Sequence, residues 1–244
     1  GKIYRGDHLF NLESDQDPLL EKVGINSIID LRSSREINDS PNPYIGQIRS
    51  VYCDPNAHIA AFAGLIQDAD KGLSIENILD NPDIDMTHIT QTQAEKQMIQ
   101  QQHDFVTTES GKTAFKRVLE TMLLEDSAPS YQHCRGGKDR TGYSIMLIMA
   151  ALGVKKDLLV EDYLLTKKAR EEKNAVYLEE FKKLAGDNEE VVSYLYTFFD
   201  TKESFIQGAF NALESYGGLE KYLENEMKLN KNDILNLREK YLEG

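Results

Sequence analysis

The sequence lacks the features that mark several unusual classes of protein. It has 6 prolines and 16 glycines in 244 residues, and 40% of its residues are hydrophobic, which excludes collagen-like, low-complexity and wholly disordered chains. It has 2 cysteines, too few for a fold held together by disulfide bonds. Its longest apolar run, residues 143–154, is too short to cross a bilayer and is typical of a buried helix.

Positive charge is also scarce, because 28 Lys and Arg face 41 Asp and Glu, a formal net charge of −13. Such a surface repels nucleic acid and anionic membranes, so we expect no nucleic-acid partner and no stable insertion into a membrane. An anion must therefore be gathered by a local basic pocket. The sequence begins with Gly1 rather than Met, so we expect a trimmed start, and a removed signal peptide leaves both a cytoplasmic and a secreted location open.

The first half of the chain alternates strand and helix signals. Short apolar runs predict strands at residues 25–31, 48–53 and 130–133. Helical spacing predicts helices at residues 17–23, 57–66 and 115–123, and an exposed helix face in the glutamine-rich run 91–102. A turn cluster is expected at residues 80–85.

The second half of the chain is helical and charged throughout. Helices are predicted at residues 142–152, 158–173, 175–184, 189–200, 203–215, 219–227 and 233–242, with Asn230 as a cap before the last. No repeat or flexible linker interrupts the chain. We expect a single α/β domain over residues 1–244, with a small, mostly parallel sheet flanked by helices and a helical C-terminal half.

The chemistry is concentrated in residues 131–142, Tyr-Gln-His-Cys-Arg-Gly-Gly-Lys-Asp-Arg-Thr-Gly. A short strand delivers Cys134, and two adjacent glycines allow a tight curl before the helix begins. Successive N–H groups of such a curl and the positive helix end bind anions and stabilise a thiolate. Arg140 can return across the loop to grip two phosphate oxygens, and Thr141 can donate a hydrogen bond to the sulfur. His133 can brace the loop through backbone hydrogen bonds.

The Cys-x5-Arg spacing is the signature of cysteine-dependent phosphatases. Residues 133–142 resemble the His-Cys-x-x-Gly-Lys-Asp-Arg-Thr-Gly loop of bacterial tyrosine/serine phosphatases related to phosphoinositide phosphatases. Segments at 4–6, 24–33, 162–166 and 217–242 are similar to the same family, and the likeness is weakest at 56–103. The resemblance implies a cysteine-phosphatase fold that hydrolyses phosphotyrosine, with phosphoserine, phosphothreonine and phosphoinositide monoesters as further substrates.

The resemblance implies a two-step mechanism through a phosphocysteine on Cys134, with a phosphoprotein or a phosphoinositide as the substrate. Phosphate or another oxyanion is expected on the loop residues Arg135, Gly136, Gly137, Lys138, Asp139 and Arg140. Three of these residues are cations and one is an anion, a local excess of +2 (3 − 1) that suits a substrate with more than one phosphate. We expect no metal and no cofactor, because the five histidines show no ligand spacing.

The proton donor is the open point of this mechanism. Related phosphatases usually take it from an aspartate in a Trp-Pro-Asp setting, and this chain has no tryptophan. Asp139 inside the loop is the first candidate, since family members are thought to use that position, but it can also pin the loop through Lys138. Asp104, 30 residues before Cys134 (134 − 104), is the second candidate, and Asp85 is the third.

Asp30, Arg32 and Cys53 each have two interpretations. Asp30 and Arg32 follow the first predicted strand, where they either support the phosphate loop or form an ion pair that holds the strand end. Glu36 is expected to pair locally with Arg32. Cys53 is either a small buried side chain or, as in phosphoinositide phosphatases of this loop type, a redox partner that forms a disulfide with Cys134.

The main alternative function is a pseudophosphatase that binds phosphate as an adaptor without turnover. Intact Cys134, Arg140 and Thr141 argue against it, because a decayed site usually loses one of them. A rhodanese-like sulfurtransferase and a metal-dependent phosphatase are more remote. Inhibition by vanadate together with insensitivity to EDTA separates these alternatives.

Overall fold

The computed structural model describes residues 1–10, 12, 22–45, 48–67, 89–186 and 188–242. Most of the helix expected at 17–23 and the whole turn cluster at 80–85 lie outside these residues. The strands are β1 (Ile3–Gly6), β2 (Ser27–Asp30), β3 (Arg49–Tyr52) and β4 (Ser130–His133). The helices are α2 (Ser34–Asp39), α3 (His58–Gln67), α5 (Gln91–Thr107), α6 (Glu109–Leu123), α7 (Asp139–Ala151), α8 (Lys156–Ala169), α9 (Glu171–Ala185), α10 (Glu189–Thr197), α11 (Glu203–Glu214), α12 (Leu219–Asn225) and α13 (Lys231–Tyr241).

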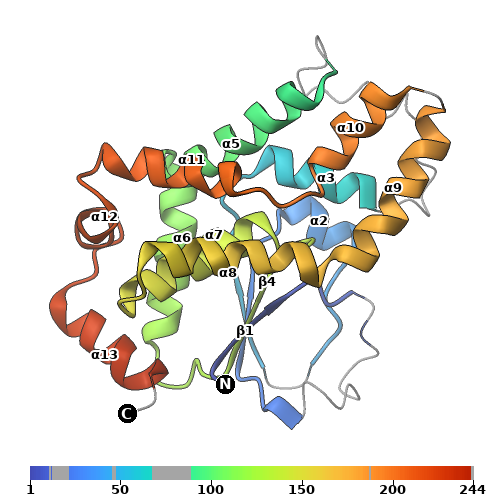
Figure 1. The fold of residues 1–244 in the computed structure, drawn as a ribbon. Helices are drawn as coiled ribbons and strands as arrows, with labels where there is room; N and C mark the ends of the chain where they lie inside the picture. The colour runs from blue at the N-terminus through green and yellow to red at the C-terminus, as the bar shows by residue number, and fades with distance from the viewer. Residues whose placement is uncertain (11, 13–21, 46–47, 68–88, 187, 243–244) are drawn as a thin grey trace.

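The described strands form one parallel sheet in the order β1-β4-β2-β3 (Figure 1). The central pair, β2 and β4, aligns Ser27 with Ser130 and Asp30 with His133. The three predicted strands and the small parallel sheet are confirmed. Because the strands run the same way, their carboxyl ends meet at one edge of the sheet, where open α/β sheets bind ligands.

The sequence pattern did not predict β1. Its four residues, Ile-Tyr-Arg-Gly, are all partly exposed and lie at the edge of the sheet. The strand is defined by its partner, since Tyr4 lies opposite Tyr131 and Gly6 lies opposite His133. Pairing with a distant segment, rather than local alternation of apolar residues, therefore decides its conformation.

The two faces of the sheet bury different sets of apolar side chains. Ile29 and Val51 belong to the main core, which they share with residues of α5, α6 and α7. Ile28 joins Leu9 and Ile25 in a smaller cluster. Successive residues of a strand point to opposite faces, which explains why Ile28 and Ile29 belong to different clusters.

The chain after β4 is helical, as predicted. The buried helix α7 packs against α8, and α5 packs against α10 and α11 (Figure 1). α7 begins at Asp139, three residues before the predicted start at Gly142. Asp139, Arg140 and Thr141 of the motif therefore form the first turn of this helix, and the helix fixes their directions.

Two local predictions differ from the structure. The glutamine-rich run is helical, but the expected exposed face is wrong for Gln101 and Gln102, which are buried. Gln101 Oε1 accepts a hydrogen bond from the N–H of Ala60 at 2.6 Å, so the run ties α5 to α3. The single helix expected at 158–173 divides at Arg170, the residue between α8 and α9.

Candidate active site

The motif forms a tight loop between the end of β4 and the start of α7. Gly137 has φ +62°, and a Cβ at this residue would lie 2.3 Å from the carbonyl oxygen of Gly6. A Cβ at Gly136 would lie 2.7 Å from the guanidinium of Arg170. Gly137 is therefore required by its backbone conformation and by the close approach of the Gly6 backbone, whereas a side chain at Gly136 would displace the Arg170 guanidinium.

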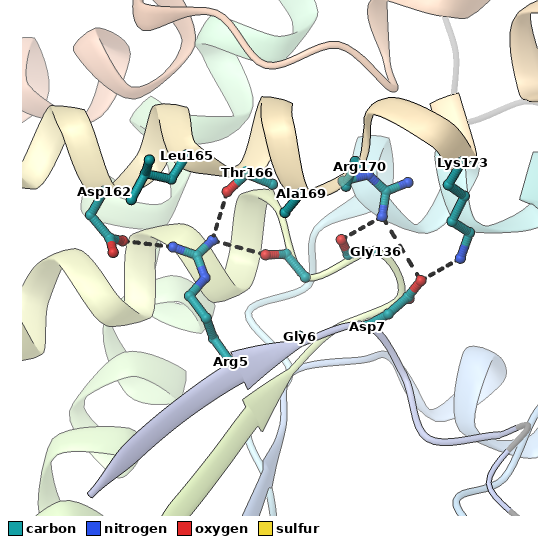
Figure 2. Close-up of a pocket in the computed structure, with 11 residues that line it drawn as sticks. Arg5, Gly6, Asp7, Gly136, Asp162, Leu165, Thr166, Ala169, Arg170 and Lys173 are labelled. Carbon is teal, nitrogen blue, oxygen red and sulfur yellow. Dashed lines mark hydrogen bonds and ion pairs between the residues drawn. The ribbon is translucent and has the colours of Figure 1, made fainter. Parts of the chain in front are cut away.

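Two arginines hold the carbonyl side of this loop (Figure 2). Arg170 donates from Nη1 to the carbonyl of Gly136 at 2.6 Å. Arg5 donates from Nη2 to the carbonyl of Gly137 at 2.9 Å. In a trans peptide the C=O and the following N–H point in opposite directions, so this arrangement turns N–H groups toward the inner side of the loop. A curl of this kind has the form of the backbone nests that bind anions.

The arginine clamp joins segments that are distant in the sequence. Arg5 Nη1 donates to Asp162 at 2.7 Å, and Arg5 Nη2 also donates to Thr166 Oγ1 at 3.1 Å (Figure 2). Residues 4–6 and 162–166, which carry part of the family resemblance, therefore meet behind the loop. Their contacts hold the backbone of the loop that carries Cys134.

Arg140 is held by Glu36 of α2. Its Nη1 and Nη2 donate to the two carboxylate oxygens of Glu36 at 2.6 and 2.8 Å, and both side chains are buried. Burial by itself raises the pKa of the Glu36 carboxyl, but the charge and hydrogen bonds of Arg140 outweigh it and lower that pKa to about 2. The predicted local pair between Glu36 and Arg32 is wrong, because the capping box with Ser33 begins α2 and Glu36 turns toward Arg140.

Two polar atoms in the first turn of α7 are buried without a hydrogen-bond partner among the described residues. They are Nε of Arg140 and Oγ1 of Thr141. A buried polar group left unpaired costs about 1–3 kcal/mol. An oxyanion in the loop offers the acceptors that these two groups lack, which fits the phosphate-binding role that the spacing predicts.

A buried polar network lies at the carboxyl ends of β2 and β4. Arg32 Nη2 and Asp30 Oδ2 form a fully buried ion pair at 2.7 Å. Asn42 Nδ2 lies 3.1 Å from the same Asp30 oxygen and 3.2 Å from His133 Nε2. His133 Nδ1 in turn lies 3.1 Å from the carbonyl oxygen of Cys134. Asp30 and Arg32 thus form the ion pair and, through Asn42, also support the loop.

This network determines the tautomer of His133. A carbonyl oxygen only accepts, so Nδ1 carries the proton and donates to the Cys134 carbonyl. Burial lowers the pKa of His133, which keeps the ring neutral and leaves Nε2 to accept from the Asn42 amide. The contact with the Cys134 carbonyl is a backbone hydrogen bond of the kind through which His133 is expected to brace the loop.

The loop, α3 and the end of α10 enclose a small pocket at Cys134. Ala60 and Ala63 of α3 form one wall, and Phe198 and Phe199 form another. The loop residues that line this catalytic pocket are Cys134, Arg135, Gly136, Lys138, Asp139 and Arg140. The Cys134 side chain is only 3% exposed. The structure therefore gathers the predicted nucleophile, the predicted acid and the predicted phosphate ligands other than Gly137 in one enclosed space.

The sequence analysis places three cations around the loop, but in the structure Lys138 and Asp139 are engaged in other contacts. The Lys138 ammonium donates to the carbonyls of Phe198 at 2.6 Å and Asp200 at 2.8 Å, and lies 3.5 Å from an Asp139 carboxylate oxygen. Its charge is used to hold the connection between α10 and α11. Asp139 also accepts from the Tyr163 hydroxyl at 3.3 Å, so this carboxylate both pins the loop and lines the pocket.

The other two candidates for the proton donor are not brought to the pocket. Asp104 lies on α5, where its carboxylate accepts from Gln100 at 2.7 Å, and it does not line the pocket. Asp85 lies outside the described residues. Asp139 is the candidate that shares the pocket with Cys134.

Cys53 follows β3 and is 2% exposed in the main core. Burial raises the pKa of its thiol to about 12. Cys53 and Cys134 extend the two strands on either side of β2, and two strand spacings separate their Cα atoms by about 10 Å. Disulfides join Cα atoms less than about 7 Å apart, so the proposed bond requires the backbone to move. The redox role stays a prediction.

Within the described residues, no group of three or more His, Cys, Asp and Glu side chains is arranged to hold a metal ion. No helix of this part of the chain has the length and apolar character needed to cross a membrane.

The sequence analysis missed the role of four residues that hold the loop: Arg5, Glu36, Asn42 and Arg170. Ser33 and Glu36 have the spacing of a capping box, which marks a helix start but not a partner 104 residues away. Neither Asn42 nor Arg170 lies in a pattern that indicates its contact with the loop.

Comparison with known proteins agrees with this geometry. A family model described as "Tyrosine phosphatase family" matches residues 1–243. The chain is 29% identical over 177 residues to the triple specificity protein phosphatase PtpB of Mycobacterium tuberculosis, a match that covers 67% of this chain and 60% of that protein. It is 30% identical over 113 residues to a protein of Cupriavidus necator named "putative tyrosine-protein phosphatase", covering 46% of this chain and 39% of that one.

The chain thus spans less than two thirds of the length of either relative. The family model, in contrast, covers nearly the whole chain, including the strands, the loop and the residues that clamp it. This protein belongs to the tyrosine phosphatase family.

Proposed function

We propose that this protein is a cysteine-dependent phosphatase that hydrolyses phosphotyrosine monoesters through a phosphocysteine intermediate. One observation carries the proposal: Cys134, Asp139 and Arg140 line a single pocket, and two hydrogen bonds that the Arg140 guanidinium donates to Glu36 hold it in place. A nucleophile, a proton donor and a fork that binds phosphate oxygens thus occupy one enclosed space.

In the first step the Cys134 thiolate attacks phosphorus, and the P–O bond to the tyrosine oxygen breaks. Asp139 gives its proton to the departing oxygen. The loop N–H groups and Arg140 hold the three remaining phosphate oxygens as their charge shifts. Thr141 donates a hydrogen bond toward the sulfur.

In the second step Asp139 takes a proton from water while the water oxygen attacks phosphorus. The S–P bond breaks, its electron pair returns to Cys134 as a thiolate, and inorganic phosphate leaves. Every proton is thus carried by the chain or by water. We expect full turnover in excess EDTA.

Phosphoserine, phosphothreonine and phosphoinositide monoesters are further proposed substrates. The name of the mycobacterial relative describes triple specificity, and Arg135 lines the pocket beside Arg140. A second phosphate near the mouth would meet the Arg135 cation. Lys138 gives weaker support than its charge suggests, because two backbone carbonyls already hold its ammonium.

The test is steady-state turnover, with EDTA present, of a phosphotyrosine peptide, a phosphoserine peptide and phosphoinositide vesicles. We expect wild type to turn over the phosphotyrosine peptide and Cys134→Ser to show no turnover while still binding vanadate. A wild type that binds vanadate but is inert on every substrate would replace the proposal with the adaptor function.

The proton donor is tested with Asp139→Asn against Asp104→Asn. We expect Asp139→Asn to lower kcat on the peptide about 10²–10⁴-fold, the range of general acid catalysis. The loss should be much smaller on p-nitrophenyl phosphate, whose leaving oxygen needs little protonation. Asp104→Asn should match wild type on both substrates, and the reverse pattern would assign the proton donor to Asp104.

A further inference from the structure

A second cavity of about 370 Å³ lies on the outer side of the catalytic loop (Figure 2). Its walls are the end of β1, the loop glycines and the face of α8 that carries Leu165 and Ala169. It shares only Gly136 and Arg170 with the catalytic pocket. Arg170 therefore stands in the wall between the two spaces, and a ligand in this outer cavity would not touch Cys134.

The outer cavity is positively charged although the protein carries −13. Arg5, Arg170 and Lys173 face it together with two carboxylates, Asp7 and Asp162, an excess of +1 (3 − 2). Because Arg5 is paired with Asp162 and Lys173 with Asp7, the excess positive charge belongs to Arg170, and a positive charge in a cavity wall attracts a small anion.

Hydrogen-bond donors remain available in this cavity. The described contacts of Arg170 all use Nη1, while its Nε is buried without a partner and the residue is 7% exposed. Lys173, in contact with Asp7, is 41% exposed and keeps further N–H groups for a ligand. Arg170 and Lys173 thus converge on the same space from the start of α9 (Figure 2).

Part of the remaining lining is apolar. Leu165 and Ala169 lie one helical turn apart on α8 and both line the cavity (Figure 2). A ligand that fits has one anionic end for the arginine and lysine and a short hydrocarbon body for the α8 face. Apolar cavities with a few convergent polar groups are the usual form of small-molecule sites.

We propose that this outer cavity binds a carboxylate with a short hydrocarbon chain and that the bound anion regulates the catalytic loop. The carboxylate pairs with Arg170 and Lys173 and competes with the Gly136 carbonyl for the Arg170 guanidinium. The loop N–H groups then lose part of their fixed orientation. This regulatory consequence rests on the proposed phosphatase function, whereas the binding itself does not.

Binding is tested by calorimetry with hexanoate as the probe and with vanadate saturating the catalytic pocket. We expect a Kd of about 1 mM, in the range of a ligand of this size. Lys173→Gln should weaken binding about tenfold, the effect of one lost charge-assisted hydrogen bond. Lys168→Gln is the matched control, because Lys168 is exposed on α8 outside the cavity lining. Uncharged hexanamide should not bind.

Regulation is tested by the effect of hexanoate on phosphotyrosine peptide turnover. We expect kcat to fall at least twofold at saturation with KM unchanged, and Lys173→Gln to need about ten times more hexanoate. Competitive inhibition, or equal binding by wild type and Lys173→Gln, would overturn the proposal. Hexanoate binding to a protein without phosphatase activity would keep the site and reject the proposed function instead.

Discussion

The carboxyl end of the sheet and the helical C-terminal half both contain deeply buried side chains, but those side chains differ in chemistry. At the strand ends the buried side chains include Asp30, Arg32 and Arg140, each at 1% exposure or less. In the helical half they include Phe205 and Leu213 of α11, equally buried and wholly apolar. Charged side chains are rarely buried unless they are paired, so the first region needs a complete set of partners.

This difference in chemistry indicates that one region stabilises the fold and the other holds the loop. A buried ion pair contributes little net stability, because the loss of hydration offsets the attraction, whereas breaking one is costly. Apolar burial stabilises by about 25 cal/mol per Å². We infer that the helical half supplies most of the stability and that the network at the strand ends holds the catalytic loop.

The largest effect on both stability and activity is expected for Glu36→Gln, because Glu36 is the buried partner of Arg140. This variant leaves the Arg140 charge buried without its carboxylate, so the free energy of unfolding should fall by about 3–5 kcal/mol. The kcat should fall about 10²–10³-fold, because the fork is no longer fixed. Urea unfolding and peptide turnover measure the two changes.

The matched control is Asp39→Asn on the same helix, which removes an exposed partner 3.9 Å from Arg35. It should change the free energy of unfolding by less than about 1 kcal/mol and leave kcat unchanged. If Glu36→Gln behaved like this control, the pair with Arg140 would have no part in catalysis.

Leu213→Ala tests the same comparison in the helical C-terminal half. Leu213 is 1% exposed in the helical half, and its truncation should lower the free energy of unfolding by about 2–5 kcal/mol. The kcat and KM of the folded enzyme should stay at the wild-type values, in contrast to Glu36→Gln. Leu235→Ala, at a residue 53% exposed, is the control and should cost about 0.5 kcal/mol or less. A large loss of kcat in Leu213→Ala would break the division of tasks.

The pH dependence of the free energy of unfolding should also arise from the buried charges at the strand ends. The pKa of Glu36 is about 2 in the folded protein against 4.5 ordinarily, so its contribution is fully present above pH 4.5 and is lost as the pH falls toward 2. The difference corresponds to about 3 kcal/mol. Urea unfolding from pH 7 to pH 3 should show a smaller decline for Glu36→Gln than for wild type. Leu213→Ala should run parallel to wild type, and equal declines in all three would remove Glu36 as the cause.

The smallest effect is expected at Asn42, which connects Asp30 to His133. Asn42→Ala should lower the free energy of unfolding by about 1 kcal/mol through the lost hydrogen bonds, with a severalfold loss of kcat. Asn42→Asp brings a carboxylate to His133 Nε2 and should raise the pKa of that histidine. The pH profile of kcat/KM should then shift in Asn42→Asp but not in Asn42→Ala. Unchanged profiles in both variants would limit Asn42 to a structural role.

The predictable parts of this protein are those that neighbouring residues encode. The strand, the two glycines and the following helix are contiguous, so the motif predicts both the path of the loop and the place of Cys134. The brace from His133 to the Cys134 carbonyl joins adjacent residues, and it was predicted for the same reason.

The parts that escaped prediction depend on contacts between distant segments. β1 is a strand because it pairs with β4, more than 120 residues away. The ammonium of Lys138 binds two backbone carbonyls beyond α10, and a carbonyl leaves no mark in the sequence because every residue has one. The glutamines of α5 are buried because α3 and α11 pack against that helix.

The sequence by itself determined the family and the parallel α/β class, and it predicts the roles proposed for Cys134, Arg140 and Asp139, because local order along the chain specifies a strand, a curl and a helix. Only the tertiary structure decided which of the 41 acidic residues meets Arg140 and which arginines hold the loop carbonyls. The physical reason is that a buried charge selects its partner by the packing of whole elements, and that packing is set by contacts across the entire chain.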